Sequence, residues 1–279
     1  VAVGTFALDV GAVTAFMWTF REREKIQNIF DRIAGARFTT SYTRIGGVAS
    51  DLDSEAIKMI KEFLDQYKDA HEEFEKLLNT NRIFIDRLEG IGILPKEDAI
   101  NLGITGPNLR GSGVEYDIRR AKPYLFYNEI DFNIPVYNEG DSLARYFVRV
   151  DELKESSKIV YQCLDKLPQG PTMANDAKKV LPKKEEIYTK MEELIHDFML
   201  VNFGINPPVG DVYSAVENPK GELGFYIVSN GTGYPWKFKI RSPSFCNLQA
   251  LPLICKNQMI SDVVAIIGSI DPVMGEADK

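Results

Sequence analysis

The stretch DSEAIKMIKEFLDQYKDAHEEFEKLL, residues 53–78, decides the fold class of this chain. Its apolar residues recur every three or four positions over about six helical turns, which is the period of an amphipathic α-helix. Asp53 stands at the position of an N-cap. The chain is therefore expected to be mainly helical. The apolar positions of this helix are Ile57, Ile60, Phe63, Leu64, Tyr67, Phe74, Leu77 and Leu78.

Helical patterns on both sides of this stretch extend the expected core. An apolar lead-in from residue 1 continues into an amphipathic helix that contains Phe16 and Phe20 and stops at Gly35. Shorter helices are predicted over residues 81–88 and 94–103, and long ones over residues 145–167 and 185–203. The chain should thus contain four long helices, with REREK (residues 21–25) on an exposed face and His71 and His196 on solvated faces.

Two regions break the helical period. Residues 103–143 lose periodicity and collect Gly, Pro, Asn and Tyr, so long loops packed on the helices are expected there. Residues 211–241 instead alternate in the manner of short strands with turns at NPKG and NGTG, which predicts an antiparallel β meander. The expected fold class is α+β, mainly helical. A single domain over residues 1–279 would have its helical core at 1–102 and 144–203, and C-terminal helices with a buried tail at 245–279.

The composition excludes several classes of protein. The 279 residues carry a net charge of -7 and no basic stripe, which argues against a nucleic-acid partner. No apolar run is long enough to span a bilayer. The three cysteines lie far apart, so no sequence-local metal site is expected. The Gly-x-Gly pairs at residues 111–113 and 231–233 lack the rest of a dinucleotide-binding motif and are interpreted as turns.

Asp9 is the first candidate for chemistry. It is flanked by Leu8 and Val10 in the segment FALDVGAVTAF. An ionised carboxylate is costly to bury without a partner, so such a residue is either paired or able to take up a proton. A structural acid that caps a helix or binds a buried arginine is the first interpretation, and proton chemistry is the alternative.

Five segments, in order along the whole chain, resemble the hydrogenase-like quinone-site subunit of respiratory complex I, the one called D in bacteria. They are ALDVGAVTAFMWTFREREKI, GARFTTSYTRIGGV, LRGSGVEYDIRRAKPY, PKGELGFYIVSNGTGYPWKFKIRSPSF and DVVAIIGSIDPVMGEADK. The resemblance implies a helix bundle like that of the nickel-iron hydrogenase large subunit. It also suggests that residues 1–279 are part of a longer chain, because family members carry a further N-terminal region with the His and Tyr at the quinone headgroup.

The resemblance assigns roles to matching positions. Asp9 would lie behind the headgroup histidine as its partner or as a proton relay, and Phe16 and Phe20 would line the cavity wall. Val273 and Met274, after the Asp271-Pro272 step, would face the quinone chamber. In the related hydrogenases this C-terminus supplies metal thiolates, but Val273 and Glu276 replace the cysteines and Lys279 replaces the histidine. A soft-metal site needs thiolates, so no metal is expected here.

The implied function is that of a quinone-binding subunit of proton-translocating NADH:quinone oxidoreductase, with quinone as substrate. Electrons would come from an iron-sulfur cluster in a neighbouring subunit. Other implied partners are the small peripheral-arm subunit and the membrane subunit at the quinone entrance. The expected location is peripheral, on the cytoplasmic side of the bacterial inner membrane or the matrix side of the mitochondrial one. A structural scaffold and a hydrogenase-related large subunit remain the alternatives.

Overall fold

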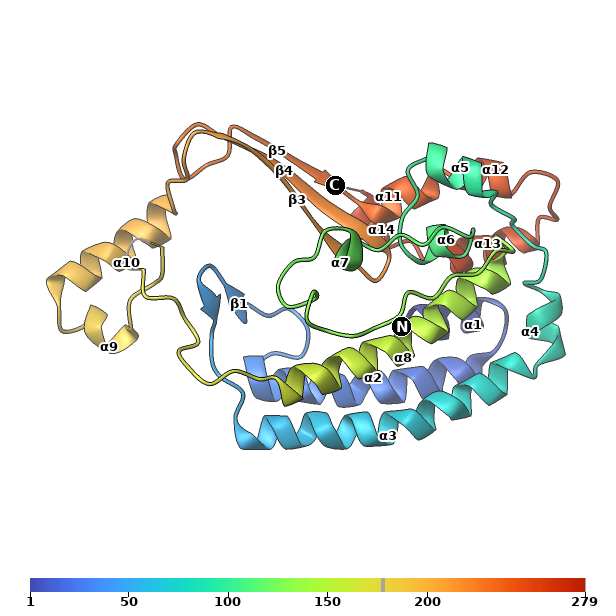
Figure 1. Cartoon of the computed structure of the whole chain (residues 1–279), viewed down its shortest axis with the longest axis horizontal. Helices are drawn as coiled ribbons and strands as arrows, with labels where there is room; N and C mark the ends of the chain where they lie inside the picture. The colour runs from blue at the N-terminus through green and yellow to red at the C-terminus, as the bar shows by residue number, and fades with distance from the viewer. Residues whose placement is uncertain (177–178, 279) are drawn as a thin grey trace.

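Three long helices lie lengthwise beside one another in the computed structural model, which describes residues 1–176 and 179–278. They are α2 (Val13–Ala34), α3 (Ser54–Asn79) and α8 (Ser142–Asp165) (Figure 1). The carboxylate of Asp53 accepts a hydrogen bond from the Ala56 N–H at 2.7 Å, as expected of an N-cap. Gly35 ends α2 in a left-handed conformation with φ 71°. The stop and start signals in the sequence therefore place these helices correctly.

A core cluster forms where these helices meet α1 (Ala2–Asp9), α4 (Arg82–Asp86) and α13 (Asp262–Ile270). The Tyr146 ring packs edge-on against Phe84, and its hydroxyl donates to the Asn79 amide oxygen at 2.9 Å, so its polar end is satisfied. This cluster joins the first and last parts of the described chain. Its buried members are Val3, Phe6, Ala7, Ala15, Phe74, Leu78, Phe84, Leu88, Tyr146, Val150 and Ala265.

The structure corrects the expected helices at two places. The apolar lead-in is a separate helix, α1, which turns into α2 at Gly11, where φ is 93°. The helix predicted over residues 185–203 is interrupted, giving α9 (Lys184–Ile187) and α10 (Met191–Phe203). At the break, the Thr189 hydroxyl donates to the Glu185 carbonyl at 3.0 Å, a side-chain bond that competes with the helical backbone. A small hairpin, β1 (Thr43–Arg44) with β2 (Gly47–Val48), was not predicted.

His71 is buried, contrary to the solvated face expected from the acidic residues around it. Its imidazole is 4% exposed between the aromatic rings of Tyr67 and Phe74. The Tyr67 hydroxyl lies 3.3 Å from His71 Nδ1, and burial lowers the pKa of the imidazole. The prediction failed because the acidic residues around His71 give no sign that α8 covers this side of α3. In REREK, Glu22 is likewise buried, and it binds Arg21 and Lys25.

The loops of residues 103–143 are held by packing, as predicted, and contain the short helices α6 (Pro107–Arg110) and α7 (Ile118–Ala121). Arg110 anchors them. Its guanidinium is 2% exposed and binds Glu152 on α8 and Glu217 on the sheet, at 2.5 and 2.9 Å. The ion pairs with several carboxylates offset the desolvation cost of the buried cation. They also connect the loops to α8 and to the sheet.

The predicted meander is present as β3 (Gly210–Asn218), β4 (Gly221–Ser229) and β5 (Lys237–Arg241), in that order and antiparallel. Tyr213 faces Tyr226 across the first pair. The β3–β4 turn docks against α6, because the backbones of Gly106 and Gly221 approach so closely that a Cβ on Gly106 would lie 2.5 Å from the Gly221 Cα. This contact brings Lys220 next to the C-terminal end of α13.

A second core cluster packs α5 (Lys96–Asn101), α6 and α13 against Ala250 and α12 (Leu251–Ile254). Helix α11 (Pro243–Leu248) also contacts α13. The chain continues past α13 to the short helix α14 (Met274–Ala277). Helices and an antiparallel sheet in separate layers confirm the α+β class (Figure 1). In the described parts of the chain, no helix has the length and apolar character needed to cross a membrane.

Candidate functional site

The site residues expected from the sequence lie around α1 and its two neighbours, α2 and α13. The crossing of α1 over α2 depends on Gly4, because a Cβ there would lie 2.0 Å from Thr19 Oγ1 and 3.5 Å from the Phe16 Cα. Only a residue without a side chain permits this approach. The first turn of α1 therefore lies on the face of α2 that carries Phe16.

Phe16 and Phe20 form a half-buried aromatic pair on α2. Their ring centroids are 4.2 Å apart at an interplanar angle of 38°. The Arg23 guanidinium lies 5.5 Å from the centroid of the Phe20 ring, within range of a cation–π contact. The two rings thus present an apolar surface with a cationic edge.

Asp9 is at the C-terminal end of α1, where it packs against α13. A Cβ on Gly268 would lie 2.9 Å from Asp9 Oδ2, so the carboxyl rests on this glycine. Partial desolvation there raises the pKa of Asp9 above its ordinary value. Within the described residues no hydrogen bond or ion pair reaches its carboxyl. Asp9 is exposed in the described chain, so the burial expected from its apolar neighbours is not found and its carboxyl needs neither an arginine nor a cap. Its role in proton chemistry stays a prediction.

The Asp271-Pro272 step forms a left-handed turn at the end of α13. Asp271 has φ 56° and ψ 56°, whereas a residue before proline ordinarily takes an extended conformation. Lys220 from the β3–β4 turn binds the Asp271 carboxylate in a salt bridge. Aspartate tolerates this region because its short side chain accepts local hydrogen bonds and ion pairs. The Asp271-Pro272 step is thus part of a structured turn.

Two fully buried arginines on α8 support this turn. Arg149 donates to the Ile270 carbonyl and to the Asn108 amide oxygen, both at 3.2 Å. Arg145 binds the Ser269 hydroxyl and the Gly92 carbonyl at 2.9 and 3.0 Å. Burial lowers the pKa of Arg145 to about 9. Arg149 thereby satisfies the Ile270 carbonyl at the end of α13, a group that a helix leaves without a partner of its own, while Arg145 fixes the Ser269 side chain.

Val273 and Met274 are exposed, at 44% and 69%, so the tail is buried only as far as Ile270. The expectation of a buried tail over residues 245–279 is wrong for this stretch. The backbone is nevertheless anchored, because the Val273 N–H donates to the Ser244 hydroxyl at 3.2 Å and Ser244 also binds the Glu276 carboxylate. Lys279, the third position compared with the metal ligands of hydrogenases, lies outside the described residues.

The structure brings some expected site residues near one another. Val1, at the start of α1, lies within electrostatic range of Arg23, Lys220 and Asp271, so the aromatic pair and the Asp271 turn flank the same end of α1. Asp9 is at the other end, about 11 Å away at the rise of an α-helix. Two cavities on the described surface, at α10 and between α3 and α8, are lined by none of the five expected site residues.

The buried support of the site was missed in the sequence. Arg145, Arg149, Asn108 and Lys220 do not stand out as chemistry-bearing residues. A signal was present for the arginines, since LARYFVRV places them four positions apart on a helix whose other residues there are mostly apolar. For Lys220 there was none, because its contact depends on how the β3–β4 turn meets α6.

The donor side chains that the structure describes form no metal centre. Among the residues that the structure describes, no group of three or more His, Cys, Asp or Glu side chains converges on a point. Cys163 is exposed, and Cys246 and Cys255 are half-buried, all as free thiols. The site therefore consists of an apolar wall, a carboxyl with a raised pKa and a turn fixed by buried cations.

Comparison with known proteins identifies the family to which the chain belongs. Residues 9–279 match the family described as respiratory-chain NADH dehydrogenase, 49 Kd subunit, and the chain belongs to this family. It is 59% identical over 278 residues to a D subunit of NADH-quinone oxidoreductase from Chloroherpeton thalassium, covering 100% of this chain and 63% of that protein.

Two further relatives carry the same designation. The chain is 56% identical to the NADH-quinone oxidoreductase D subunit of Salinibacter ruber and 52% identical to that of Methylacidiphilum infernorum, each over 99% of this chain. It spans 62% and 66% of those two proteins. The matched region is thus slightly less than two thirds of the length of these relatives.

Proposed function

We propose that this chain forms one wall of the quinone-reduction chamber in a proton-translocating NADH:quinone oxidoreductase. The observation that carries the proposal is the 59% identity, over the whole chain, to a protein named as the D subunit of NADH-quinone oxidoreductase. The half-buried pair of Phe16 and Phe20 supports it, because an apolar aromatic surface suits a quinone ring and its isoprenoid tail.

The chemistry of this wall is positioning and proton supply. Reduction of a quinone to a quinol takes up two electrons and two protons. In this proposal the electrons come from an iron-sulfur cluster in a neighbouring subunit, as the family resemblance implies. Asp9, whose pKa is raised by desolvation, can hold a proton and pass it toward the headgroup histidine that the family carries outside these residues.

Substitution of Asp9 tests its role. In the assembled enzyme, we expect Asp9→Asn to lower kcat for quinone reduction by roughly tenfold or more, with the KM for quinone little changed, because an amide cannot carry the proton. Asp9→Glu keeps the carboxyl and should retain most activity. Unchanged quinone reduction and proton pumping in Asp9→Asn would remove the residue from the mechanism.

Photolabelling distinguishes the proposal from an inert scaffold. A quinone analogue with a photoreactive group on its ring should form adducts with Phe16, Phe20, Val273 or Met274 in the assembled enzyme, and excess quinone should suppress them. Val273 and Met274 are exposed in this chain alone, so they are free to face a chamber completed by other subunits. A scaffold would give no quinone-protectable adduct at these positions.

The hydrogenase-like helix bundle and its descent are part of the same proposal. The turn at Asp271 is retained while thiolates are absent at Val273 and Glu276, and Glu276 instead binds Ser244. Quinone reductase activity without stoichiometric nickel in the purified complex is the expected result. We place this chain peripherally at the membrane, beside the iron-sulfur subunit, the small peripheral-arm subunit and the membrane subunit at the quinone entrance.

A further inference from the structure

Helix α10 packs none of its residues into the interior of the described chain. It runs from Met191 to Phe203, and no side chain on it is buried. It lies at the far end of the molecule from α13, joined to the rest by extended segments (Figure 1). An isolated helix of this length is only marginally stable in water, so its apolar face needs a partner.

One face of α10 is a continuous apolar stripe. Met191, Leu194, Phe198 and Val201 follow the i, i+3, i+7, i+10 spacing of a single helix face. Their side chains are 74%, 51%, 58% and 67% exposed. We refer to these four residues as the docking stripe. Scattered apolar residues on a surface need no explanation, but a contiguous stripe marks a contact site.

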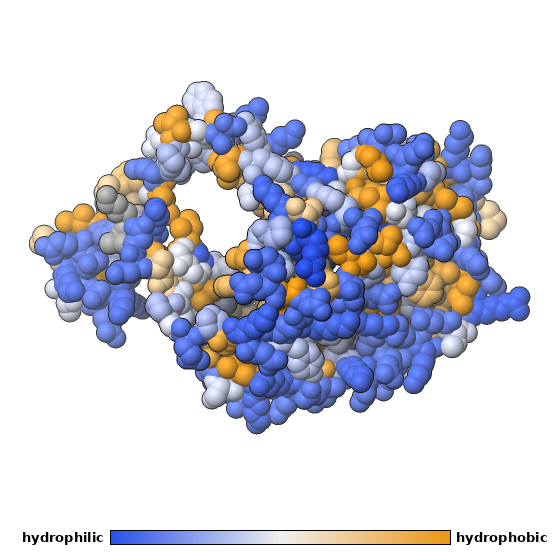
Figure 2. Space-filling view, in the orientation of Figure 1, coloured by the Kyte–Doolittle hydropathy of each residue, from blue (hydrophilic) through white to orange (hydrophobic). Residues whose placement is uncertain are grey.

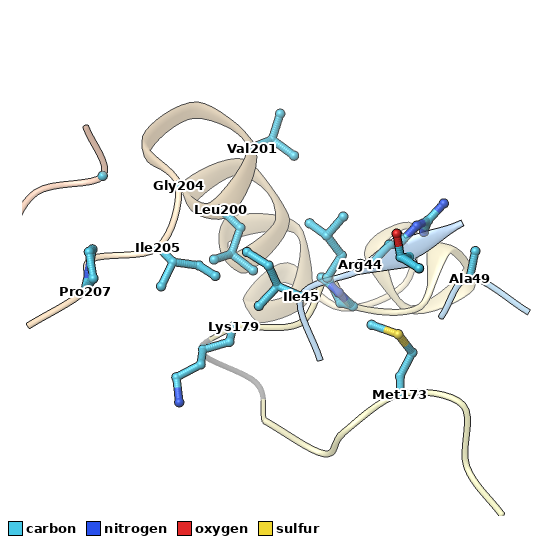
Figure 3. Close-up of a pocket in the computed structure, with 14 residues that line it drawn as sticks. Arg44, Ile45, Ala49, Met173, Lys179, Leu200, Val201, Gly204, Ile205 and Pro207 are labelled. Carbon is cyan, nitrogen blue, oxygen red and sulfur yellow. The ribbon is translucent and has the colours of Figure 1, made fainter. Parts of the chain in front are cut away.

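A groove of about 940 Å³ adjoins the C-terminal end of the docking stripe. Figure 3 shows Leu200 and Ile205 pointing toward Ile45 of the β1–β2 hairpin across this groove. Apolar surface thus continues from α10 toward the helical core. Figure 2 shows an opening between the lobe of α10 and the far part of the sheet, so the groove is accessible.

The charges of α10 select the kind of partner. The helix carries Glu192, Glu193 and Asp197 and contains no lysine or arginine. Helices that lie on anionic bilayers are rich in lysine and arginine on their polar face, so α10 has the opposite sign for a lipid surface. A second copy of this chain is equally unsuitable, because a two-fold contact through the stripe would bring the Asp197 carboxylates of both helices together.

We propose that the docking stripe and the adjoining groove bind an apolar surface on a different protein subunit, bordered by lysine or arginine side chains. The proposal rests on the proposed function, because the partner would belong to the same oxidoreductase. The contact is of the helix-in-groove type, with Leu194 and Phe198 as its central anchors. Asp197, next to the stripe on the helix, pairs with the basic border of the partner.

Crosslinking in the assembled enzyme tests the contact. Benzoylphenylalanine at position 198 should form one crosslinked species on irradiation, and peptide mass spectrometry should locate its other end on a different subunit. The same residue at position 192, which is exposed, does not line the groove and lies about 120° around the helix from Phe198, is the matched control and should give at least tenfold less of that species. The contact is scored without turnover, so its failure is separable from failure of the quinone-binding role.

Assembly supplies a second measurement. Phe198→Asp should reduce the amount of this subunit that co-purifies with the enzyme at least tenfold, whereas Phe198→Leu should leave it unchanged. Circular dichroism on the purified variant subunits verifies that both are folded. Crosslinks confined to lipid, to a second copy or to another part of the same polypeptide would overturn the proposal, as would full assembly of Phe198→Asp.

Discussion

At Gly268 the chain has no room for a side chain, since a Cβ would lie 2.7 Å from Phe6 Cδ2 and 2.9 Å from Asp9 Oδ2. Gly268→Ala should therefore push α1 away from α13. Overpacking costs about 1–3 kcal/mol, and the better helix propensity of alanine returns at most about 1 kcal/mol. We expect a net loss of about 1–2 kcal/mol in the free energy of unfolding, measured by urea denaturation.

Gly275 is the matched control for this substitution. It lies in α14, and a Cβ added there would have no atom within 4 Å, so Gly275→Ala adds a methyl group to open space. Its free energy of unfolding should equal or slightly exceed that of the parent chain. Equal effects of the two substitutions would show that the contact between α1 and α13 is loose.

His71 should make the stability of the chain depend on pH. Burial lowers the pKa of the folded imidazole, while Glu75, Asp151 and Glu72 oppose this shift and Lys154 adds to it. The unfolded chain then binds the proton more tightly, so stability is complete above the unfolded pKa near 6.5 and is lost as pH falls below it. His71→Gln should flatten the stability profile below about pH 6.5, measured by thermal unfolding.

At the scale of elements, Asp141 determines where α8 begins. One carboxylate oxygen accepts from the Ala144 N–H at 2.7 Å and the other from the Gly90 N–H at 2.8 Å. Asp141→Ala removes an N-cap worth about 1 kcal/mol and leaves a partly buried donor without a partner, at about 1–3 kcal/mol. The free energy of unfolding should fall by about 2–4 kcal/mol in chemical denaturation. Asp141→Asn, which keeps one acceptor, should lose clearly less.

Helices were predicted correctly from the sequence where their limits depend only on neighbouring residues. The period of residues 53–78, the cap at Asp53 and the stop at Gly35 are properties of neighbouring residues, and each is confirmed. The break at Thr189 and the burial of His71 were missed, because they depend on a side-chain bond within the turn and on which helix covers α3. The β1–β2 hairpin is too short to show an alternating pattern.

The candidate site was predictable only in part, for the same reason. The contact between the Phe16 and Phe20 rings follows from their spacing of one helical turn, and their role at a cavity wall stays a prediction. The support of the Asp271 turn was not, because Lys220, Asn108 and Arg149 reach it from three segments distant in sequence. Contacts set by tertiary packing leave no pattern in any one of those segments.

At the scale of the whole molecule, Arg110 connects the helical core with the sheet. Arg110→Ala would leave Glu152, Glu217 and Asp117 without their shared cation, and an uncompensated buried charge costs about 3–5 kcal/mol. We expect a loss of this size in the free energy of unfolding. Amides of β3 and of residues 116–118 should lose most protection in hydrogen exchange.

Arg37 is a control for the loss of an arginine ion pair. Its side chain is 47% exposed and pairs with Glu24 on the surface. Exposed pairs contribute under about 1 kcal/mol, so Arg37→Ala should be nearly neutral. If Arg110→Ala were equally mild, the sheet would not depend on the Arg110 cluster for its attachment to the core.

The packing of α1 on α13 has a consequence for biosynthesis. Phe6 and Ala7 find their partner in Ala265 and its neighbours, almost the whole length of the matched region later in the chain. At translation speeds of about 5–20 residues per second, α1 waits on the order of ten seconds or more before that partner exists. During this interval the side of α1 that packs on α13 is exposed on the nascent chain. A chaperone that shields it until α13 emerges from the ribosome would raise the yield of folded subunit.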